Sequence, residues 1–191
     1  VDALYRLARA GVRVPEPYGC FDGVLLMELI TDENGDVAPR LNEVSMSAEQ
    51  AREDHALMMH YVMCMLCAGL VHGDLSEFNV LVDENGPVII DLPQAVDAAA
   101  NNNARSMLER DVKNMSDYYG LFAPELRNSH YAEEIWALYE EGLLHPDVKL
   151  TGQFEVDTHA ADVDSVMQEI KAALADEESR KQRLRDAEAG D

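Results

Sequence analysis

Two short apolar runs near the middle of the chain constrain its fold more than any other feature. Residues 80–82 (VLV) and 88–90 (VII) are separated by only five residues, DENGP at 83–87. A polar connection of this length that contains Asn-Gly is typical of a β-hairpin, because Gly and Asn adopt positive φ angles easily. The residue before the first strand and the residue after the second lie at the same end of a hairpin. The pattern therefore predicts that Asn79 and Asp91 lie close together.

The side chains at this end of the hairpin suit a magnesium ion and phosphoryl transfer. An amide oxygen from Asn79 and a carboxylate from Asp91 are hard oxygen ligands, and Mg²⁺ completes its shell with water and nucleotide phosphates. Asp74, on the loop that leads to the hairpin, is placed to orient a phosphoryl acceptor. We therefore predict catalytic roles for Asp74 and Asp91, metal ligation by Asn79 and Asp91, and ATP and Mg²⁺ as cofactors. Each residue alone has an ordinary structural explanation as a cap, a turn residue or a strand end, and only their joint spacing favours catalysis.

A long, nearly all-apolar helix is predicted directly before this site. It begins at Ser47, where Ser47 and Gln50 have the spacing of a capping box, and runs to Gly69. The Cys64-x-x-Cys67 pair lies inside it among several methionines. Core packing is favoured over a metal or redox site, because zinc would need a second ligand pair.

The flanking regions are predicted to be mostly helical. Residues 2–10 indicate a helix, residues 14–17 must be extended because of their prolines, and residues 24–30 (VLLMELI) indicate a strand. Further helices are expected from Asp97 to about Tyr119 and over residues 133–141. An apolar stripe that begins at Val163 indicates another helix, which fades into a charged tail.

The charge of the chain argues against several classes of partner. It carries 15 Lys and Arg against 37 Asp and Glu, a formal net charge of −22. Phosphate backbones and anionic membrane surfaces would be repelled, so we expect no direct binding of nucleic acid or membrane. The most apolar stretch, residues 56–71, is too short to span a bilayer, and a cytoplasmic location is the default expectation.

Three motifs resemble the RIO family of atypical protein kinases. Residues 72–79 (HGDLSEFN) resemble its catalytic loop, H-x-D-L-S-E-[FY]-N, and residues 89–97 (IIDLPQAVD) resemble its metal-binding loop. Residues 108–114 (LERDVKN) resemble the helix that follows, and the resemblance extends over about residues 4–119. An α+β, protein-kinase-like fold is therefore implied, mostly the helical C-lobe with a remnant of the N-lobe sheet.

The resemblance also implies a division of the chain and a set of roles. Residues 1–30 would be the remnant N-lobe and hinge, 31–150 the C-lobe, and 151–191 an acidic helical extension. At the hinge, Glu28 and Ile30 would bind the adenine base through their main chain, so replacing their side chains should have little effect. His72 would hold the catalytic loop by hydrogen bonds.

The implied function is ATP-dependent phosphoryl transfer to serine or threonine of a protein. Alternatively, Asp91 could itself accept the phosphoryl group, giving an ATPase switch that acts with a ribosome-assembly partner. No glycine-rich loop or strand lysine precedes residues 2–10, so we expect these parts upstream of Val1 and expect the chain alone to be inactive. A small-molecule kinase of the aminoglycoside or choline type, which shares H-G-D-x4-N, and a non-catalytic nucleotide-binding scaffold remain alternatives.

Two departures from ordinary protein kinases fit the same family. Gly73 stands where most kinases have the arginine of H-R-D, and Asp91-Leu92-Pro93 replaces D-F-G. The tripeptide APE at 123–125 follows a predicted helix instead of a substrate-binding loop, so we interpret it as accidental.

Overall fold

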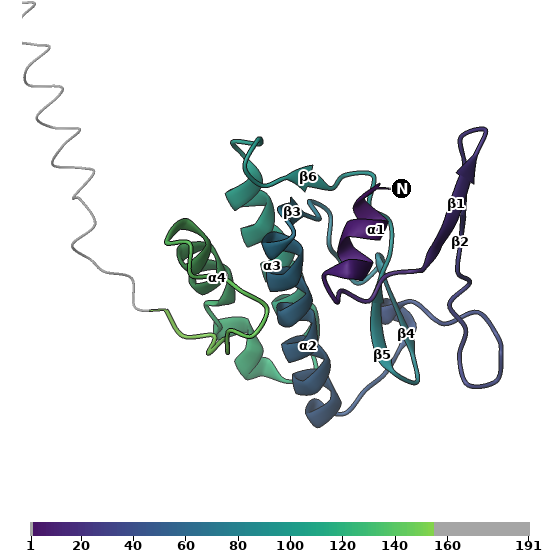
Figure 1. Ribbon diagram of the computed structural model, residues 1–191. Helices are drawn as coiled ribbons and strands as arrows, with labels where there is room; N and C mark the ends of the chain where they lie inside the picture. The colour runs from purple at the N-terminus through teal and green to yellow at the C-terminus, as the bar shows by residue number, and fades with distance from the viewer. Residues whose placement is uncertain (1, 155–191) are drawn as a thin grey trace, which may run out of the picture. The chain divides into compact units, whose positions relative to one another are not determined.

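A layer of three helices forms the core of residues 2–154, the part that the computed structural model describes. The helices are α2 (Ala48–Cys67), α3 (Ala104–Tyr119) and α4 (Tyr131–Glu140), which pack against one another (Figure 1). α2 also contacts strands on its other side. These contacts bury nearly every side chain from Met58 to Leu66, whereas Glu49, Arg52 and Glu53 in the first half of α2 are exposed.

The boundaries of α2 confirm the predicted helix. Ser47 is the N-cap, and its hydroxyl oxygen accepts a hydrogen bond from the backbone N–H of Gln50 at 3.1 Å. Gly69 follows the helix with a φ of 74°, a left-handed conformation that favours glycine.

The two cysteines of α2 have different surroundings. Cys64 is buried in the core as expected, whereas Cys67 is exposed, so the core-packing prediction is correct for Cys64 only. Burial raises the pKa of Cys64 to about 11 and also raises the pKa of Cys67. Both shifts favour the protonated thiol, which argues against a reactive thiolate.

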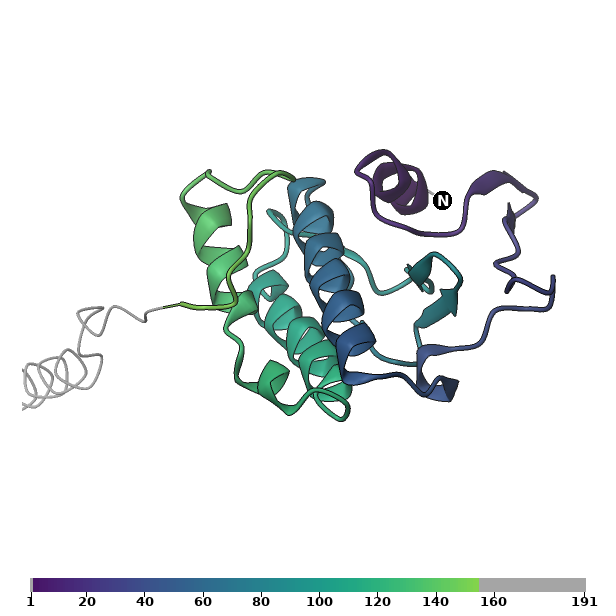
Figure 2. The same cartoon turned by 90° about the horizontal axis from the view of Figure 1, so that it is seen from below.

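Three two-stranded antiparallel sheets accompany the helices. They pair β1 (Pro17–Phe21) with β2 (Val24–Met27), β3 (Leu70–Val71) with β6 (Val96–Asp97), and β4 (Val80–Asp83) with β5 (Gly86–Ile89). Helices and small antiparallel sheets together confirm the α+β class. Figure 2 shows the β4–β5 hairpin lying between the helical layer and the β1–β2 hairpin.

The β4–β5 hairpin is the one that the sequence predicts, with a shorter turn. Val80 pairs with Ile89 and Asp83 with Gly86, so only two residues connect the strands. Of the Asn-Gly pair, Gly86 supplies the expected positive φ, at 106°. The side chain of Asp83 accepts the N–H of Asn85 at 2.8 Å, which stabilises the turn in that conformation.

The predicted strand at residues 24–30 is too long. Only residues 24–27 are in β2, because Ile30 leaves the ladder and its carbonyl accepts the N–H of Ala38 at 3.0 Å. Its partner β1 was not predicted, because only Pro17 falls within the segment 14–17 that was expected to be extended. Asp22 and Gly23, which join the two strands, both have positive φ, at 49° and 83°. Asp-Gly is a strong hairpin signal that the sequence analysis did not use.

The helices flanking α2 agree with the sequence except at one boundary. α1 (Asp2–Arg9) and α4 confirm the helices predicted at 2–10 and 133–141. The helix predicted from Asp97 begins only at Ala104, because the Asp97 carboxylate accepts the N–H groups of Ala99 and Ala100, each at 3.0 Å, in a turn.

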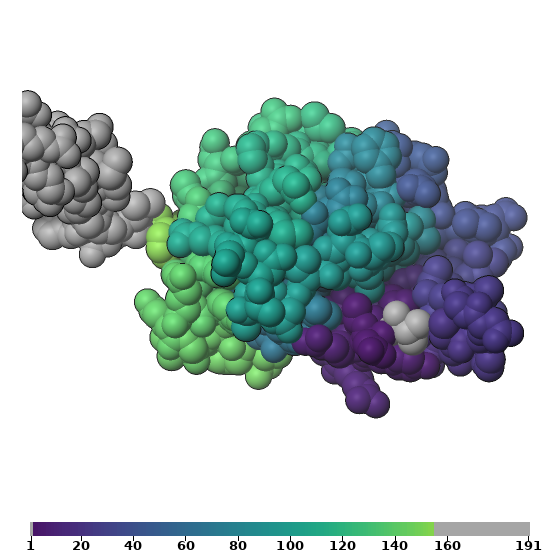
Figure 3. Space-filling model, turned by 90° about the horizontal axis from the view of Figure 1, so that it is seen from above, coloured from purple at the N-terminus to yellow at the C-terminus, as the bar shows by residue number. Residues whose placement is uncertain are grey.

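The remaining described segments are short or irregular. Two 3-10 turns complete the fold, η1 (Leu41–Glu43) and η2 (Pro124–Asn128). In the space-filling view of Figure 3, the N-terminal residues pack directly against the middle of the chain. No helix within residues 2–154 is long and apolar enough to cross a membrane. The helix expected from Val163 lies outside the described residues, as does most of the predicted extension.

Candidate active site

A pocket of about 310 Å³ opens between the β1–β2 side of the molecule and the β4–β5 hairpin. Asn79 and Asp91 both line it. The N–H of Ile90 donates to the carbonyl of Asn79 at 2.9 Å, which extends the hairpin ladder by one bond. The predicted approach of these two residues is therefore confirmed.

The donor set of the pocket fits a magnesium ion. The amide nitrogen of Asn79 donates to the backbone oxygen of Asp74 at 2.8 Å and to its carboxylate at 3.3 Å. This orientation leaves the amide oxygen of Asn79 available beside the exposed carboxylate of Asp91. Within residues 2–154 no three His, Cys, Asp or Glu side chains gather as a metal site. Two protein oxygens with water and phosphate completing the shell is the arrangement that Mg²⁺ commonly adopts.

Asp91 has an unusual backbone conformation. Its φ is 63°, and it is one of two non-glycine residues with positive φ in the described part of the chain. This region destabilises an L-residue by roughly 1–2 kcal/mol. Such conformations concentrate at functional sites, where the surrounding structure enforces them.

His72 connects the catalytic loop to the end of the hairpin. Its Nε2 lies 3.1 Å from the carbonyl of Ile90, and its Nδ1 lies 3.3 Å from the backbone nitrogen of Asp74. A single neutral tautomer, protonated on Nε2, makes both hydrogen bonds. The predicted holding role of His72 thus has a geometric basis.

The carboxylate of Asp111 on α3 holds the loop at residues 73–75. One carboxylate oxygen accepts the N–H of Gly73 at 2.7 Å and the other accepts the N–H of Leu75 at 3.0 Å, so the two bonds flank Asp74. Arg110 donates to the carbonyl of Gly73, and Asn114 donates to that of Leu75 at 3.0 Å. In the sequence these α3 residues stand out only as part of the family motif at 108–114. Their spacing of three and four places them on one helix face, which was the available signal.

Burial dominates the electrostatics of Asp111. It raises the pKa of the carboxyl group above its ordinary value, while the hydrogen bonds from Gly73 and Leu75 oppose the shift. The side chain is 2% exposed, and both oxygens accept N–H groups. Asp111 therefore stabilises the loop from the protein interior, whereas Asp74 is exposed to solvent.

Gly73 suits its position for a steric reason. Its φ is 81°, and a Cβ atom there would lie 2.9 Å from the backbone oxygen of Gln94 and 2.4 Å from Cε of Met107. The arginine of H-R-D would have to displace its neighbours at this point.

The segment at residues 28–30 also lines the pocket. The N–H of Glu28 donates to the carbonyl of Glu16 at 2.8 Å, and the carbonyl of Ile30 accepts from Ala38. The carbonyl of Glu28 and the N–H of Ile30 have no backbone partner among the described residues. The acceptor at Glu28 and the donor at Ile30, two residues apart, are therefore available to a ligand.

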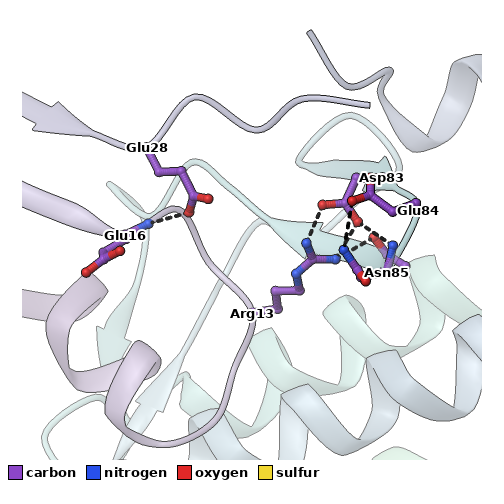
Figure 4. A network of polar contacts seen from close by, with 7 residues as sticks. Arg13, Glu16, Glu28, Asp83, Glu84 and Asn85 are labelled. Atoms are coloured by element: carbon purple, nitrogen blue, oxygen red, sulfur yellow. Dashed lines mark hydrogen bonds and ion pairs between the residues drawn. The ribbon is translucent and has the colours of Figure 1, made fainter. Parts of the chain in front are cut away.

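The side chain of Glu28 has a role that the sequence analysis did not anticipate. Its carboxylate accepts the backbone N–H of Glu16 at 3.1 Å (Figure 4). Because the two residues are also joined by a backbone bond, the carboxylate helps to fix where β2 ends.

An ion pair anchors the strand side of the pocket. The guanidinium of Arg13 donates to both carboxylate oxygens of Asp83, one of them at 2.6 Å, and the backbone carbonyl of Arg13 accepts the N–H of Ile89 at 2.9 Å (Figure 4). Burial acts to raise the pKa of Asp83, but the hydrogen bonds from Arg13 and from the turn outweigh it and lower the pKa. The segment before β1 is thereby tied to the β4–β5 hairpin.

Comparison with known sequences identifies relatives of this chain. The sequence profile of the RIO domain matches residues 1–133. RIO-type serine/threonine-protein kinase Rio1 of Haloferax volcanii is 40% identical over 116 residues, which are 61% of this chain and 39% of that protein. Serine/threonine-protein kinase RIO1 of Homo sapiens is 37% identical over 117 residues, which are 61% of this chain and 20% of that protein. RIO-type serine/threonine-protein kinase Rio2 of Methanocaldococcus jannaschii is 37% identical over 110 residues, which are 56% and 39% of the two chains.

The matched stretch covers less than half of each of these three proteins. Residues 1–133, which the profile matches, include the β4–β5 hairpin, the loop before it and the helix α3 after it. Because the profile matches most of the 191 residues, this chain belongs to the RIO family, whose relatives named here are serine/threonine-protein kinases.

Proposed function

We propose that this chain is the nucleotide- and magnesium-binding part of a RIO-type serine/threonine kinase that uses ATP. The observation that carries the proposal is that Glu28, Ile30, Asn79 and Asp91 line one pocket. The Glu28 carbonyl and the Ile30 N–H have no backbone partner among the described residues, and the Asn79 amide nitrogen, not its oxygen, bonds to Asp74. Residues 28–30 are then the hinge of a kinase fold. Residues 1–30 contribute the N-lobe side of the pocket and residues 31–150 the C-lobe side.

Each group has a chemical counterpart in a nucleotide bound with magnesium. The carbonyl of Glu28 accepts from the amino group of adenine, and the N–H of Ile30 donates to a ring nitrogen. Magnesium, when bound by Asn79 and Asp91, offsets the negative charge of the phosphates. Asp74 is exposed and hydrogen-bonded to Asn79, so it is placed to orient the hydroxyl group of a protein acceptor.

The proposed roles predict different effects of three substitutions. In the full-length protein, Asp74→Asn should leave the affinity for Mg·ADP within about twofold but abolish phosphoryl transfer, because the Asp74 carboxylate faces the acceptor. Asn79→Ala and Asp91→Asn should weaken the magnesium-dependent part of nucleotide affinity about tenfold or more. Isothermal titration with ADP, with and without Mg²⁺, measures the difference. Asp147→Asn, an exposed carboxylate outside the pocket, is the matched control. Equal loss of binding in all three variants would contradict these roles.

Asp91 is also proposed as a phosphoryl acceptor. In that step a carboxylate oxygen of Asp91 forms a bond to the γ-phosphorus, the bond to the bridging oxygen breaks, and ADP leaves; water then hydrolyses the acyl phosphate. The exposed carboxylate supports this proposal, as does the chain after it, which forms only β6 and turns before α3 and offers little platform for an extended peptide. A protein partner in ribosome assembly would respond to the phosphorylated state.

Chemical lability distinguishes this intermediate from a phosphoserine. After incubation of the full-length protein with γ-labelled ATP, label on the protein should be released by hydroxylamine and should be absent from the Asp91→Asn variant. Label that resists hydroxylamine and persists in Asp91→Asn would assign transfer directly to a hydroxyl group.

A further inference from the structure

Arg40 is the one cationic side chain that lines the pocket shared by Asn79 and Asp91. The two acidic side chains that line it are Glu28 and Asp91, and the whole chain carries a formal net charge of −22. A nucleotide with two or three phosphates would therefore enter a site with an excess of carboxylates. A cation inside such a pocket would offset part of the repulsion between these carboxylates and the phosphates.

The backbone of Arg40 is held in a fixed position beside β4. Arg40 forms an isolated antiparallel bridge with Leu81, and the carbonyl of Pro39 accepts the N–H of Val82 at 2.9 Å. The N–H of Arg40 donates to the carboxylate of Glu43 at 3.1 Å. The side chain thus starts from a rigid part of the pocket wall.

The guanidinium is held as well, but by a neutral group. Nη1 donates to the backbone carbonyl of Phe78 at 2.6 Å, directly before the metal-site residue Asn79. Among the described residues Arg40 forms no ion pair, in contrast to Arg13, Arg52 and Arg105, each of which pairs with a carboxylate. Most of the five N–H donors of the guanidinium are therefore available for a ligand.

We infer that Arg40 binds a phosphate group of the nucleotide. This inference rests on the proposed function, and it adds a positioning residue that neither the sequence motifs nor the comparisons assign. A guanidinium matches phosphate oxygens with two parallel hydrogen bonds, which a lysine cannot reproduce. The bond to Phe78 places the guanidinium one residue from the metal ligand, where the phosphates must lie if Asn79 binds their magnesium ion. Arg40 thereby makes the pocket selective for nucleotides over nucleosides.

The test compares ligands that differ only in phosphate number. Affinities of adenosine, AMP, ADP and ATP are measured by isothermal titration in the presence of Mg²⁺ for the chain, Arg40→Gln and Arg40→Lys. In Arg40→Gln the affinity for ADP and ATP should fall about tenfold or more, whereas that for adenosine should change less than twofold. Arg40→Lys should lie between the two, because charge is kept but the fork is lost. Arg127→Gln, which removes an exposed arginine on η2, is the control for net charge and should bind every ligand as the unchanged chain does.

The ligand series separates the possible failures. If Arg40→Gln weakens adenosine and ADP equally, Arg40 acts only by holding the loop at Phe78, and the inference is wrong. Unchanged binding of ADP and ATP in Arg40→Gln would overturn it as well. If the chain binds none of the four ligands, the proposed function itself fails, and the inference fails with it.

Discussion

Asp111 shows how a residue without a chemical role can determine whether a catalytic loop forms. It lies on α3, is 2% exposed, and accepts two backbone N–H groups on either side of Asp74. A buried N–H that loses its acceptor destabilises the folded state by about 1–3 kcal/mol. The geometry of Asp74 therefore depends on a side chain more than 30 positions later in the sequence.

Asp111→Asn tests this dependence with almost no change in shape. An amide presents one NH₂ group, so either Gly73 or Leu75 loses its acceptor and faces another donor. We expect the free energy of unfolding to fall by about 2–3 kcal/mol and, in the full-length protein, phosphoryl transfer to fall with it. Urea unfolding followed by circular dichroism measures the first effect. Asp117→Asn on the same helix breaks an exposed pair with Lys113 and should change stability by less than about 1 kcal/mol. Similar losses in both variants would refute the special role of Asp111.

At the scale of elements, the predictable parts are those specified by neighbouring residues. The β4–β5 hairpin and α2 follow from turn and capping residues within a few positions, and both are predicted correctly. β1 (PYGCF) was missed because it has no apolar run. The only local sign that it pairs with β2 is the Asp22-Gly23 turn between them. α3 begins late because the Asp97 side chain competes for the backbone N–H groups that a helix would need.

The same distinction applies to the site. Asp74, Asn79 and Asp91 could be proposed from the sequence, because Asn79 and Asp91 flank one hairpin and Asp74 lies on the loop before it. Arg40 could not, because it reaches the site through a contact with Phe78, 38 positions away. The only local signal for Asp111 was its place on one helix face with Arg110 and Asn114, and its partners Gly73 and Leu75 lie more than 30 positions away. Such contacts leave no local pattern in a single sequence.

The Arg13–Asp83 pair joins two elements, so its strength can be measured by a double-mutant cycle. The Asp83 side chain is 6% exposed and that of Arg13 is 29% exposed, and both ends of the guanidinium fork are used. We expect a coupling energy of about 1–2 kcal/mol between Arg13→Gln and Asp83→Asn, more than an exposed pair provides. The exposed pair between Arg105 and Glu109 serves as the comparison and should couple by about 0.5 kcal/mol. A coupling no larger than that of the exposed pair would show that the anchor contributes little.

For the molecule as a whole, the helical layer contains a buried group that makes stability depend on pH. His55 on α2 is fully buried, its Nε2 lies 2.9 Å from the hydroxyl of Ser116 on α3, and its Nδ1 has no hydrogen-bond partner among the described residues. Burial lowers the pKa of His55 from 6.5 to about 4. Above pH 6.5 the imidazole is neutral in both folded and unfolded chains. Between pH 6.5 and 4 only the unfolded chain takes up the proton, so stability falls as the pH falls.

The expected loss from His55 between pH 7.5 and pH 5 is about 2 kcal/mol. Urea unfolding at the two pH values should show this loss in the unchanged chain and not in His55→Gln, which does not titrate but can still bond to Ser116. His145→Gln removes an exposed histidine and should leave the pH dependence as it was. If His55→Gln keeps the full pH dependence, other groups are responsible for it.

The β1–β2 hairpin has a further consequence for how the pocket behaves. Its two strands pack mainly on each other, and Tyr18, Phe21, Val24 and Leu26 are all more than half exposed. A segment with so few buried contacts opens locally at a smaller free energy than the helical core, so its amides exchange with solvent sooner. The chain reaches residues 28–30 directly from this hairpin. We therefore expect one wall of the candidate pocket to open more readily than the other, which is formed by β4–β5 packed against α2 and η1.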